Sequence, residues 1–182
     1  MNYKLKNGRA VEVRLLEPGD SEKLFEYFDQ RFSKESKSRF GPHSFDWETI
    51  NAICQNPDEE TIRYVALDEG KNIVAYMLVR QGMIEWDLKR YTTRNQSYDH
   101  ITSVTFAPSV ADAWQSTGLG SLMNNLIEED LKEKNIKNII LWGGVQATNE
   151  KAIHYYKKFG YQFIASFWHD GKDNHDMVKQ LS

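Results

Sequence analysis

A glycine-containing loop between an apolar strand and an amphipathic helix constrains this chain more than any other feature. The loop spans residues 115–121, after a predicted strand over residues 101–111 and at the start of a predicted helix over residues 119–131. Its glycines, Gly118 and Gly120, allow a tight turn and a close approach of the backbone to a ligand. The helix adds N–H groups without helical partners and the positive end of its dipole, which favours a diphosphate. Taken alone, the loop is equally consistent with a plain strand-to-helix connection.

A second segment, further along the chain, is a short predicted helix that a glycine closes and a strand follows. It begins at Asn149 and ends at Gly160. Together the two segments resemble the acetyl-CoA-binding core of the GNAT N-acetyltransferase superfamily, of the bacterial type. The matching residues are Gln115, Gly118 and Gly120 in its first signature, and Asn149, Ala152, Tyr156, Gly160 and Tyr161 in its second.

The start of the chain looks like the opening of the protein-acetylating bacterial members of this superfamily. The matching stretches are residues 5–8, residues 13–14, Pro18 with Asp20, and residues 39–42. The resemblance therefore covers nearly the whole chain, and it is loosest between residues 82 and 100. It implies a single N-acetyltransferase domain over residues 1–182.

Hydrophobic periodicity and turn residues predict the element order ββααββ, then βαβα, then ββ. Asn7-Gly8 predicts a type I′ hairpin turn, and Asp170-Gly171 predicts a second tight hairpin. Residues 82–100 show no clear period and are predicted to be irregular. The predicted strands cover residues 3–6, 10–16, 62–67, 72–80, 101–111, 136–142, 161–168 and 176–181. Four helices are predicted: one after a cap at Asp20 or Ser21, one after a cap at Ser44, one over residues 119–131 and one that begins at Asn149.

The fold class expected from this order is mixed α/β with a GNAT-like arrangement. The resemblance implies a central, twisted, mixed and mostly antiparallel sheet with splayed parallel strands, flanked by about four helices. The pantetheine arm of acetyl-CoA would pair with backbone groups of Pro108, Ser109 and Val110 between the splayed strands. Pro108 suits such an opening because proline lacks an N–H, although a bulge without a ligand would also accept it.

The resemblance also assigns the diphosphate of acetyl-CoA to the glycine loop. Family members often have a basic residue at the position of Thr117, so its absence here is expected to weaken CoA binding slightly without removing the backbone amides. The residues expected to bind the cofactor there are Gln115, Ser116, Thr117, Gly118, Leu119, Gly120 and Ser121.

Two residues of the second signature have implied roles. Asn149 would contact the pantetheine; its alternative role is to cap the helix, which we expect Thr148 to do instead. Tyr156 would protonate or hydrogen-bond the departing CoA sulfur when an amine attacks the thioester, and packing in the core is its alternative. The neighbouring Tyr155 is expected to pack.

A general base is harder to identify. Protein-acetylating relatives commonly have a Glu where this chain has Thr105, and other members have one where it has Gly143-Gly144. The remaining candidates for accepting the amine proton are His100, Asp99, Glu85, Asp87 and a water chain. Three aromatic residues in the same segment, Trp86, Tyr91 and Tyr98, would either line an acceptor pocket or pack over the sheet edge.

The resemblance thus implies an acetyl-CoA-dependent N-acetyltransferase that acts by direct transfer in a ternary complex. The missing Glu favours a small-molecule primary amine as the substrate. The alternatives are a protein lysine or N-terminal acetyltransferase and, from another class, a non-catalytic acyl-CoA sensor. His154, His169 and His175 match no ligand spacing, so no metal is expected.

Composition restricts the partners and the location. The 182 residues are 40% hydrophobic, which suits one domain, and the formal charge of −3 argues against nucleic acid as the main partner. No apolar signal region or membrane-length run is present, so we expect a cytoplasmic protein without a membrane partner. The lone Cys54 is expected to pack as a small hydrophobic residue. Whether the protein forms a homodimer is left open.

Overall fold

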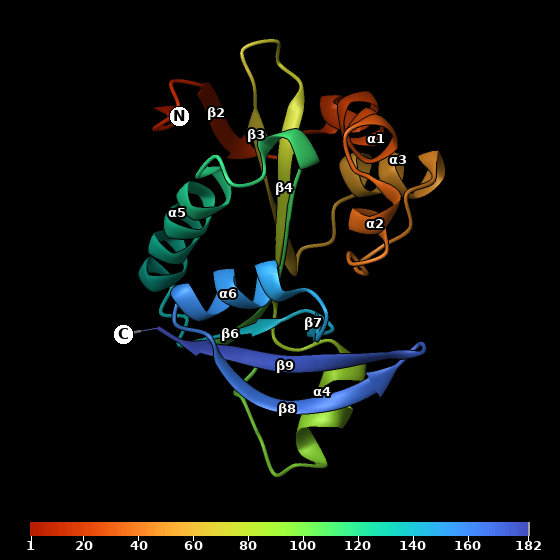
Figure 1. Ribbon diagram of the computed structural model, residues 1–182, viewed down its shortest axis with the longest axis vertical. Coiled ribbons are helices and arrows are strands. Elements are labelled where there is room, and N and C mark those ends of the chain that lie inside the picture. The colour runs from red at the N-terminus through yellow and green to blue at the C-terminus, as the bar shows by residue number, and fades with distance from the viewer. Residues whose placement is uncertain (182) are drawn as a thin grey trace. The chain divides into compact units, whose positions relative to one another are not determined.

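The computed structural model describes residues 1–181 as a mixed α/β fold around one mixed β-sheet, as expected (Figure 1). The strands are β1 (Asn2–Lys4), β2 (Ala10–Leu15), β3 (Thr61–Leu67), β4 (Ile73–Gln81), β5 (Ser103–Val110), β6 (Asn138–Leu141), β7 (Val145–Gln146), β8 (Gln162–His169) and β9 (Lys172–Gln180). The helices are η1 (Pro18–Asp20), α1 (Ser21–Gln30), α2 (Lys34–Lys37), α3 (Trp47–Gln55), α4 (Glu85–Thr92), η2 (Asp112–Trp114), α5 (Leu119–Glu133) and α6 (Glu150–Lys158).

The strand order is β1-β2-β3-β4-β5-β6-β9-β7, and β8 pairs with β9. Pairing of β5 with β6 is parallel, whereas β2 with β3, β6 with β9 and β8 with β9 are antiparallel. The helix α5 connects the two parallel strands, as a crossover connection requires. No helix within residues 1–181 is long and apolar enough to cross a membrane.

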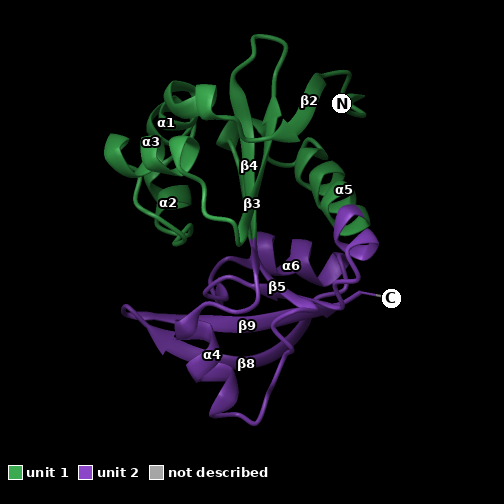
Figure 2. Cartoon of the chain, turned by 180° about the vertical axis from the view of Figure 1, so that it is seen from behind, with its two compact units in different colours: residues 1–79, 107–129 green, residues 80–106, 130–182 purple. Residues whose placement is uncertain are grey.

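The chain divides into two compact units (Figure 2). Unit 1 consists of residues 1–79 and 107–129, and unit 2 consists of residues 80–106 and the chain from residue 130 onward. The elements β4, β5 and α5 each contribute residues to both units. Each unit is therefore described by itself.

Unit 1 has an aromatic core beneath its first helix. Leu24, Tyr27 and Phe28 are fully buried on one face of α1, at the spacing of an amphipathic helix. The Phe28 ring lies 4.7 Å from the Phe45 ring and 5.7 Å from the Tyr76 ring on β4, centroid to centroid. Burying a large apolar side chain contributes about 1.5 to 3 kcal/mol, so this face attaches α1 firmly to the sheet. The predicted burial of Cys54 is confirmed.

Two local predictions in unit 1 are wrong. Asp46, not Ser44, caps α3, because the Asp46 carboxylate accepts a hydrogen bond from the Thr49 N–H at 2.8 Å. The turn at Asn7-Gly8 is not type I′, since only Gly8 has a positive φ (87°). Leu5 and Arg9 instead close a three-residue loop through the Leu5 N–H and the Arg9 carbonyl at 2.8 Å, which places the single left-handed residue at glycine.

Unit 2 contains a tight hairpin and an unexpected helix. Asp170 and Gly171 have φ values of 49° and 72°, which a two-residue type I′ turn between β8 and β9 requires. The predicted irregular segment contains α4, which lies beside β8 and β9 in both views (Figures 1 and 2). The short helix α2 in unit 1 and the two-residue strand β7 in unit 2 were also not predicted.

The helix α4 is attached by buried charges. Asp176 on β9 has no solvent exposure, and its carboxylate pairs with Arg90 Nη2 at 2.6 Å and with Arg94 Nη1 at 2.8 Å. Arg90 Nη2 also pairs with the buried Asp87 carboxylate at 2.7 Å, and the Arg90 guanidinium lies 3.7 Å from the centre of the Phe167 ring. A buried charge needs such partners, so this ion network holds α4, although the buried Arg90 Nη1 atom has no hydrogen-bond partner among residues 1–181. The buried Tyr91 ring adds an apolar contact, since it belongs to a core cluster with Ile140 and Val178.

Candidate functional site

The parallel ladder between β5 and β6 ends before Pro108. Parallel pairing with β6 runs from Ser103 opposite Asn138 to Phe106 opposite Leu141. It stops two residues before Pro108, so the proline does not interrupt the ladder with β6.

Side chains of unit 1 hold the residues that follow Pro108. The buried Ser109 hydroxyl donates to the Tyr76 carbonyl at 2.7 Å and accepts from the Tyr27 hydroxyl at 3.0 Å. The Ala111 N–H donates to the Val74 carbonyl at 2.9 Å. The Ser109 side chain therefore points into the core of unit 1, and the expected role of residues 108–110 in pairing with a ligand would fall to their backbone groups.

The glycine loop lies between η2 and the first turn of α5. Ser116 and Gly118 both have a left-handed backbone, with φ values of 61° and 92°. The Thr117 hydroxyl donates to the Trp114 carbonyl at 2.6 Å, and Leu119 is fully buried. Left-handed residues in a turn can direct backbone N–H groups toward one side, which suits anion binding. The left-handed conformation of Ser116 had no signal in the sequence, because serine rarely adopts it.

Asn149 caps α6, contrary to the expectation that Thr148 would. The Asn149 Oδ1 atom accepts a hydrogen bond from the Ala152 N–H at 3.2 Å. This bond uses the side-chain oxygen only, and the amide NH₂ group is not part of the cap. Contact with a pantetheine therefore stays a prediction for that group.

Tyr156 lies on α6 in a cluster of aromatic rings in unit 2. Its ring centre lies 5.5 Å from that of Tyr155 and 5.3 Å from that of Tyr161. Burial raises the pKa of the Tyr156 hydroxyl. The phenol therefore stays protonated at neutral pH and can donate a proton or a hydrogen bond.

The four candidates for a general base lie in different surroundings within unit 2. Glu85 pairs with Lys89 at 2.7 Å, and this hydrogen bond and charge lower its pKa. Asp99 accepts the N–H groups of Ile101 and Thr102, and these bonds lower its pKa. His100 is exposed.

Asp87 differs from the other candidates because it is completely buried. Burial raises the pKa of its carboxyl group, against the opposing effect of the Gly143 N–H, which donates to Asp87 Oδ2 at 3.0 Å, and of Arg90. Asp87 thus fixes the turn at Gly143-Gly144, where both glycines have a positive φ. Thr105, at the position where protein-acetylating relatives commonly have a Glu, is buried as well, and its hydroxyl donates to the Gly82 carbonyl at 2.7 Å.

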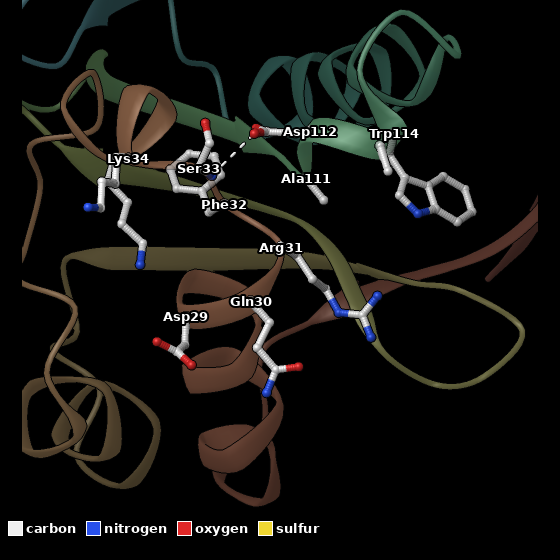
Figure 3. A pocket seen from close by; sticks show the side chains of 11 residues that line it. Asp29, Gln30, Arg31, Phe32, Ser33, Lys34, Ala111, Asp112 and Trp114 are labelled. Atoms are coloured by element: carbon white, nitrogen blue, oxygen red, sulfur yellow. Dashed lines mark hydrogen bonds between the residues drawn. The ribbon is translucent and has the colours of Figure 1, made fainter.

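Unit 1 also contains a cleft of about 620 Å³ that the sequence analysis missed (Figure 3). One wall is the end of α1, the segment that follows it and α2, and the other is the η2 turn just before Gln115. The walls come from segments far apart in the sequence, and neither carries a recognisable motif. The lining residues are Asp29, Gln30, Arg31, Phe32, Ser33, Lys34, Lys37, Ala111, Asp112, Ala113 and Trp114.

Within residues 1–181, no group of three or more His, Cys, Asp or Glu side chains is arranged to hold a metal ion.

Comparison with known families gives one match over most of the chain. The model of the acetyltransferase (GNAT) family matches residues 22–161. A sequence search of curated proteins gives no significant match.

Solved structures with the same fold include three acetyltransferases of different kinds. The GNAT domain of PAT from S. lividans is 19% identical, with a TM-score of 0.76 over 100% of this chain and 96% of that chain. A chimera of the spermidine N-acetyltransferase SpeG from Vibrio cholerae and hSSAT is 20% identical, with a TM-score of 0.64 over 93% of this chain and 95% of that one. AAC(6')-Ib, solved with paromomycin and acetyl-CoA, is 17% identical, with a TM-score of 0.68 over 93% of each chain. At these identities the likeness is one of fold.

Proposed function

Because the chain belongs to the acetyltransferase (GNAT) family, we propose that it transfers an acetyl group from acetyl-CoA to the primary amine of a small molecule. The observation that carries the proposal is the loop of residues 115–121, with left-handed residues at Ser116 and Gly118 immediately before α5. The backbone amides of this loop would hold the diphosphate, and the backbone of Pro108, Ser109 and Val110 would pair with the pantetheine arm.

The reaction is a direct transfer. The neutral amine attacks the thioester carbonyl, a C–N bond forms, and the C–S bond breaks as the tetrahedral intermediate collapses. The electron pair of the C–S bond goes to sulfur, and the Tyr156 hydroxyl donates a proton to it, which yields CoA with a free thiol. The phenolate then regains a proton from solvent, and the acetylated nitrogen loses one.

The proton lost by the amine would leave through water. Glu85 and Asp99 are held by other partners and have lowered pKa values, and Asp87 is buried in an ion network. His100 is exposed, as are Glu85 and Asp99, so a water chain could reach it. We therefore assign no side chain as a dedicated base, which is consistent with the absence of a Glu at Thr105 and at Gly143-Gly144.

Two observations support a small-molecule acceptor: the absence of a Glu at Thr105 and at Gly143-Gly144, and the proteins that share this fold. Two of the neighbours described above are named for or bound to small amines, namely spermidine and an aminoglycoside. Acetylation of protein lysine or N-termini is the alternative that the N-terminal resemblance favours. A sensor that binds acyl-CoA without turnover is the alternative outside enzymes.

Calorimetry and a thiol-release assay test the proposal in two steps. We expect saturable binding of CoA and acetyl-CoA, and no binding at millimolar ligand would refute the cofactor assignment. With binding established, acetyl-CoA is combined with polyamines, amino acids, aminoglycosides, lysine peptides and folded proteins. Turnover on a small amine supports the proposal, turnover on peptides or proteins alone supports the protein-acetylating alternative, and no turnover on any acceptor supports the sensor.

A further inference from the structure

The cleft of unit 1 is rich in cations without anionic partners. Arg31, Lys34 and Lys37 line it, and none of the three forms an ion pair within residues 1–181. The carboxylates in the lining are Asp29 and Asp112, so the cations are in excess.

The Asp112 carboxylate keeps its negative charge and is held in place by neutral hydrogen-bond donors. Its Oδ1 atom accepts from the Ser36 hydroxyl at 2.7 Å and from Gln115 Nε2 at 3.2 Å, and its Oδ2 atom accepts from the Ser33 N–H at 3.2 Å. Figure 3 shows the bond between Ser33 and Asp112, which joins the two walls. With three cationic and two anionic side chains in its lining, the cleft has an excess of one positive charge.

The same bonds fix the shape of the cleft. In addition to them, the Asp112 N–H donates to the Arg31 carbonyl at 3.1 Å, so η2 and the end of α1 are held together by backbone and side chain. The far end of the η2 wall is also held, since Arg9 Nη1 donates to the Ala113 carbonyl at 3.1 Å and its guanidinium lies 4.7 Å from the Trp114 ring centre. A site with fixed walls loses little entropy when a ligand binds.

We propose that this cleft binds an oxyanion, a phosphate monoester or a carboxylate, carried by one of the two substrates. Lysine and arginine are the side chains that hold such groups by charge-assisted hydrogen bonds. Two sources supply this chemistry: the 3′-phosphate of CoA, whose diphosphate is assigned to the loop that directly follows η2, and an acidic group on the amine. The identity of the source rests on the proposed function, whereas binding of the anion itself does not.

The test uses the Lys34→Gln/Lys37→Gln double variant of the whole protein. Glutamine keeps the helix propensity of lysine and removes the charge. The matched control is Lys4→Gln/Lys6→Gln, which removes the same charge from exposed positions of the same unit outside the cleft. Thermal unfolding is compared first, so that a folding defect is not mistaken for lost binding.

Inorganic phosphate is the first probe, and its binding is measured by NMR from the shift of the Trp114 indole N–H signal. We expect a saturable shift in the wild type and the control, and at least about tenfold weaker binding in the cleft variant. Absence of a saturable shift in the wild type, or equal affinity in all three proteins, would overturn the inference whether or not CoA binds.

Two ligand pairs then identify the source. If the 3′-phosphate is bound, 3′-dephospho-CoA binds about tenfold more weakly than CoA to the wild type and the control, and the difference disappears in the cleft variant. If the acceptor supplies the anion, the cleft variant raises KM about tenfold for 4-aminobutyrate but not for butylamine. If the cleft variant keeps both the preference for CoA over 3′-dephospho-CoA and the wild-type KM for 4-aminobutyrate, the inference is contradicted. If CoA binds to none of the three proteins, only the proposed function is contradicted.

Discussion

At the scale of single residues, the signatures around Gln115 and Asn149 predicted positions but not all contacts. The sequence placed Asn149 at the start of a helix and assigned the cap to Thr148, yet the Asn149 side chain caps α6 itself. Both residues are good caps, and only the backbone angles decide which of them occupies the N-cap position. The left-handed Ser116 was unpredictable because serine rarely adopts this conformation, and the buried Asp87 was unpredictable because its partner Gly143 is distant in the sequence.

The Tyr156→Phe substitution tests the proposed acid. We expect kcat to fall about tenfold to a thousandfold with little change in the Kd of acetyl-CoA, since only the charge that develops on sulfur loses its proton donor. Because the pKa of Tyr156 is raised, the phenol stays protonated and the deficit should be constant between about pH 7 and 9.

Tyr155→Phe is the matched control, as it removes a hydroxyl from the next position of the same helix. Its kcat should stay near the wild-type value. Unchanged turnover in Tyr156→Phe, with chemistry shown to be rate-limiting, would make Tyr156 a packing residue.

At the scale of elements, hairpins and amphipathic helices were predictable, and elements without an apolar stripe were not. The helix α1 was recognisable from its buried apolar face, whereas α4 buries Asp87 and Tyr91 and attaches through ion pairs. A helix that buries charges has no hydrophobic period, so residues 82–100 looked irregular. The helix α2 has only four residues and no buried side chain, so periodicity could not reveal it.

Substitution of Gly118 tests the element that would hold the diphosphate. A Cβ atom at Gly118 would meet no atom within 4 Å, but alanine disfavours its φ of 92°. We expect Gly118→Ala to shift the loop and weaken CoA binding about tenfold, because a left-handed residue with a side chain costs roughly 1 to 2 kcal/mol.

The control for this experiment is Gly41→Ala. It adds the same methyl group in open space at a glycine whose φ is not left-handed. Calorimetry should show wild-type affinity for this control. Equal CoA affinity of Gly118→Ala and the wild type would remove the loop from the binding site.

Substitution of Asp176 tests how α4 is attached. Asp176→Ala leaves the Arg90 guanidinium without its main partner in a buried site, and removing one member of such a pair costs about 3 to 5 kcal/mol. Denaturant unfolding measures this loss. Glu85→Gln breaks the exposed pair with Lys89 on the same helix and should leave the stability close to that of the wild type, because solvent screens exposed ion pairs. Similar losses in the two variants would contradict the buried network.

At the scale of the whole molecule, the resemblance predicted one family domain, and the chain has two compact units. We propose that they act as a single folding unit, because β4, β5 and α5 each contribute residues to both. Guanidinium unfolding followed by far-UV circular dichroism and by tryptophan fluorescence should give one coincident transition. Tryptophans occur in both units, at Trp47 and Trp114 in the first and Trp86, Trp142 and Trp168 in the second, so separate transitions would be visible.

We propose that the protein moves an acetyl group from acetyl-CoA to a small primary amine. The most direct test of this activity is to incubate the protein with acetyl-CoA and the amine panel and to measure released thiol and acetylated product, the latter by mass spectrometry. We expect one free CoA thiol for each N-acetylated small molecule, with catalytic turnover that Tyr156→Phe lowers. CoA binding without any acetylated small molecule, or acetylation confined to lysine peptides and proteins, would contradict this proposal.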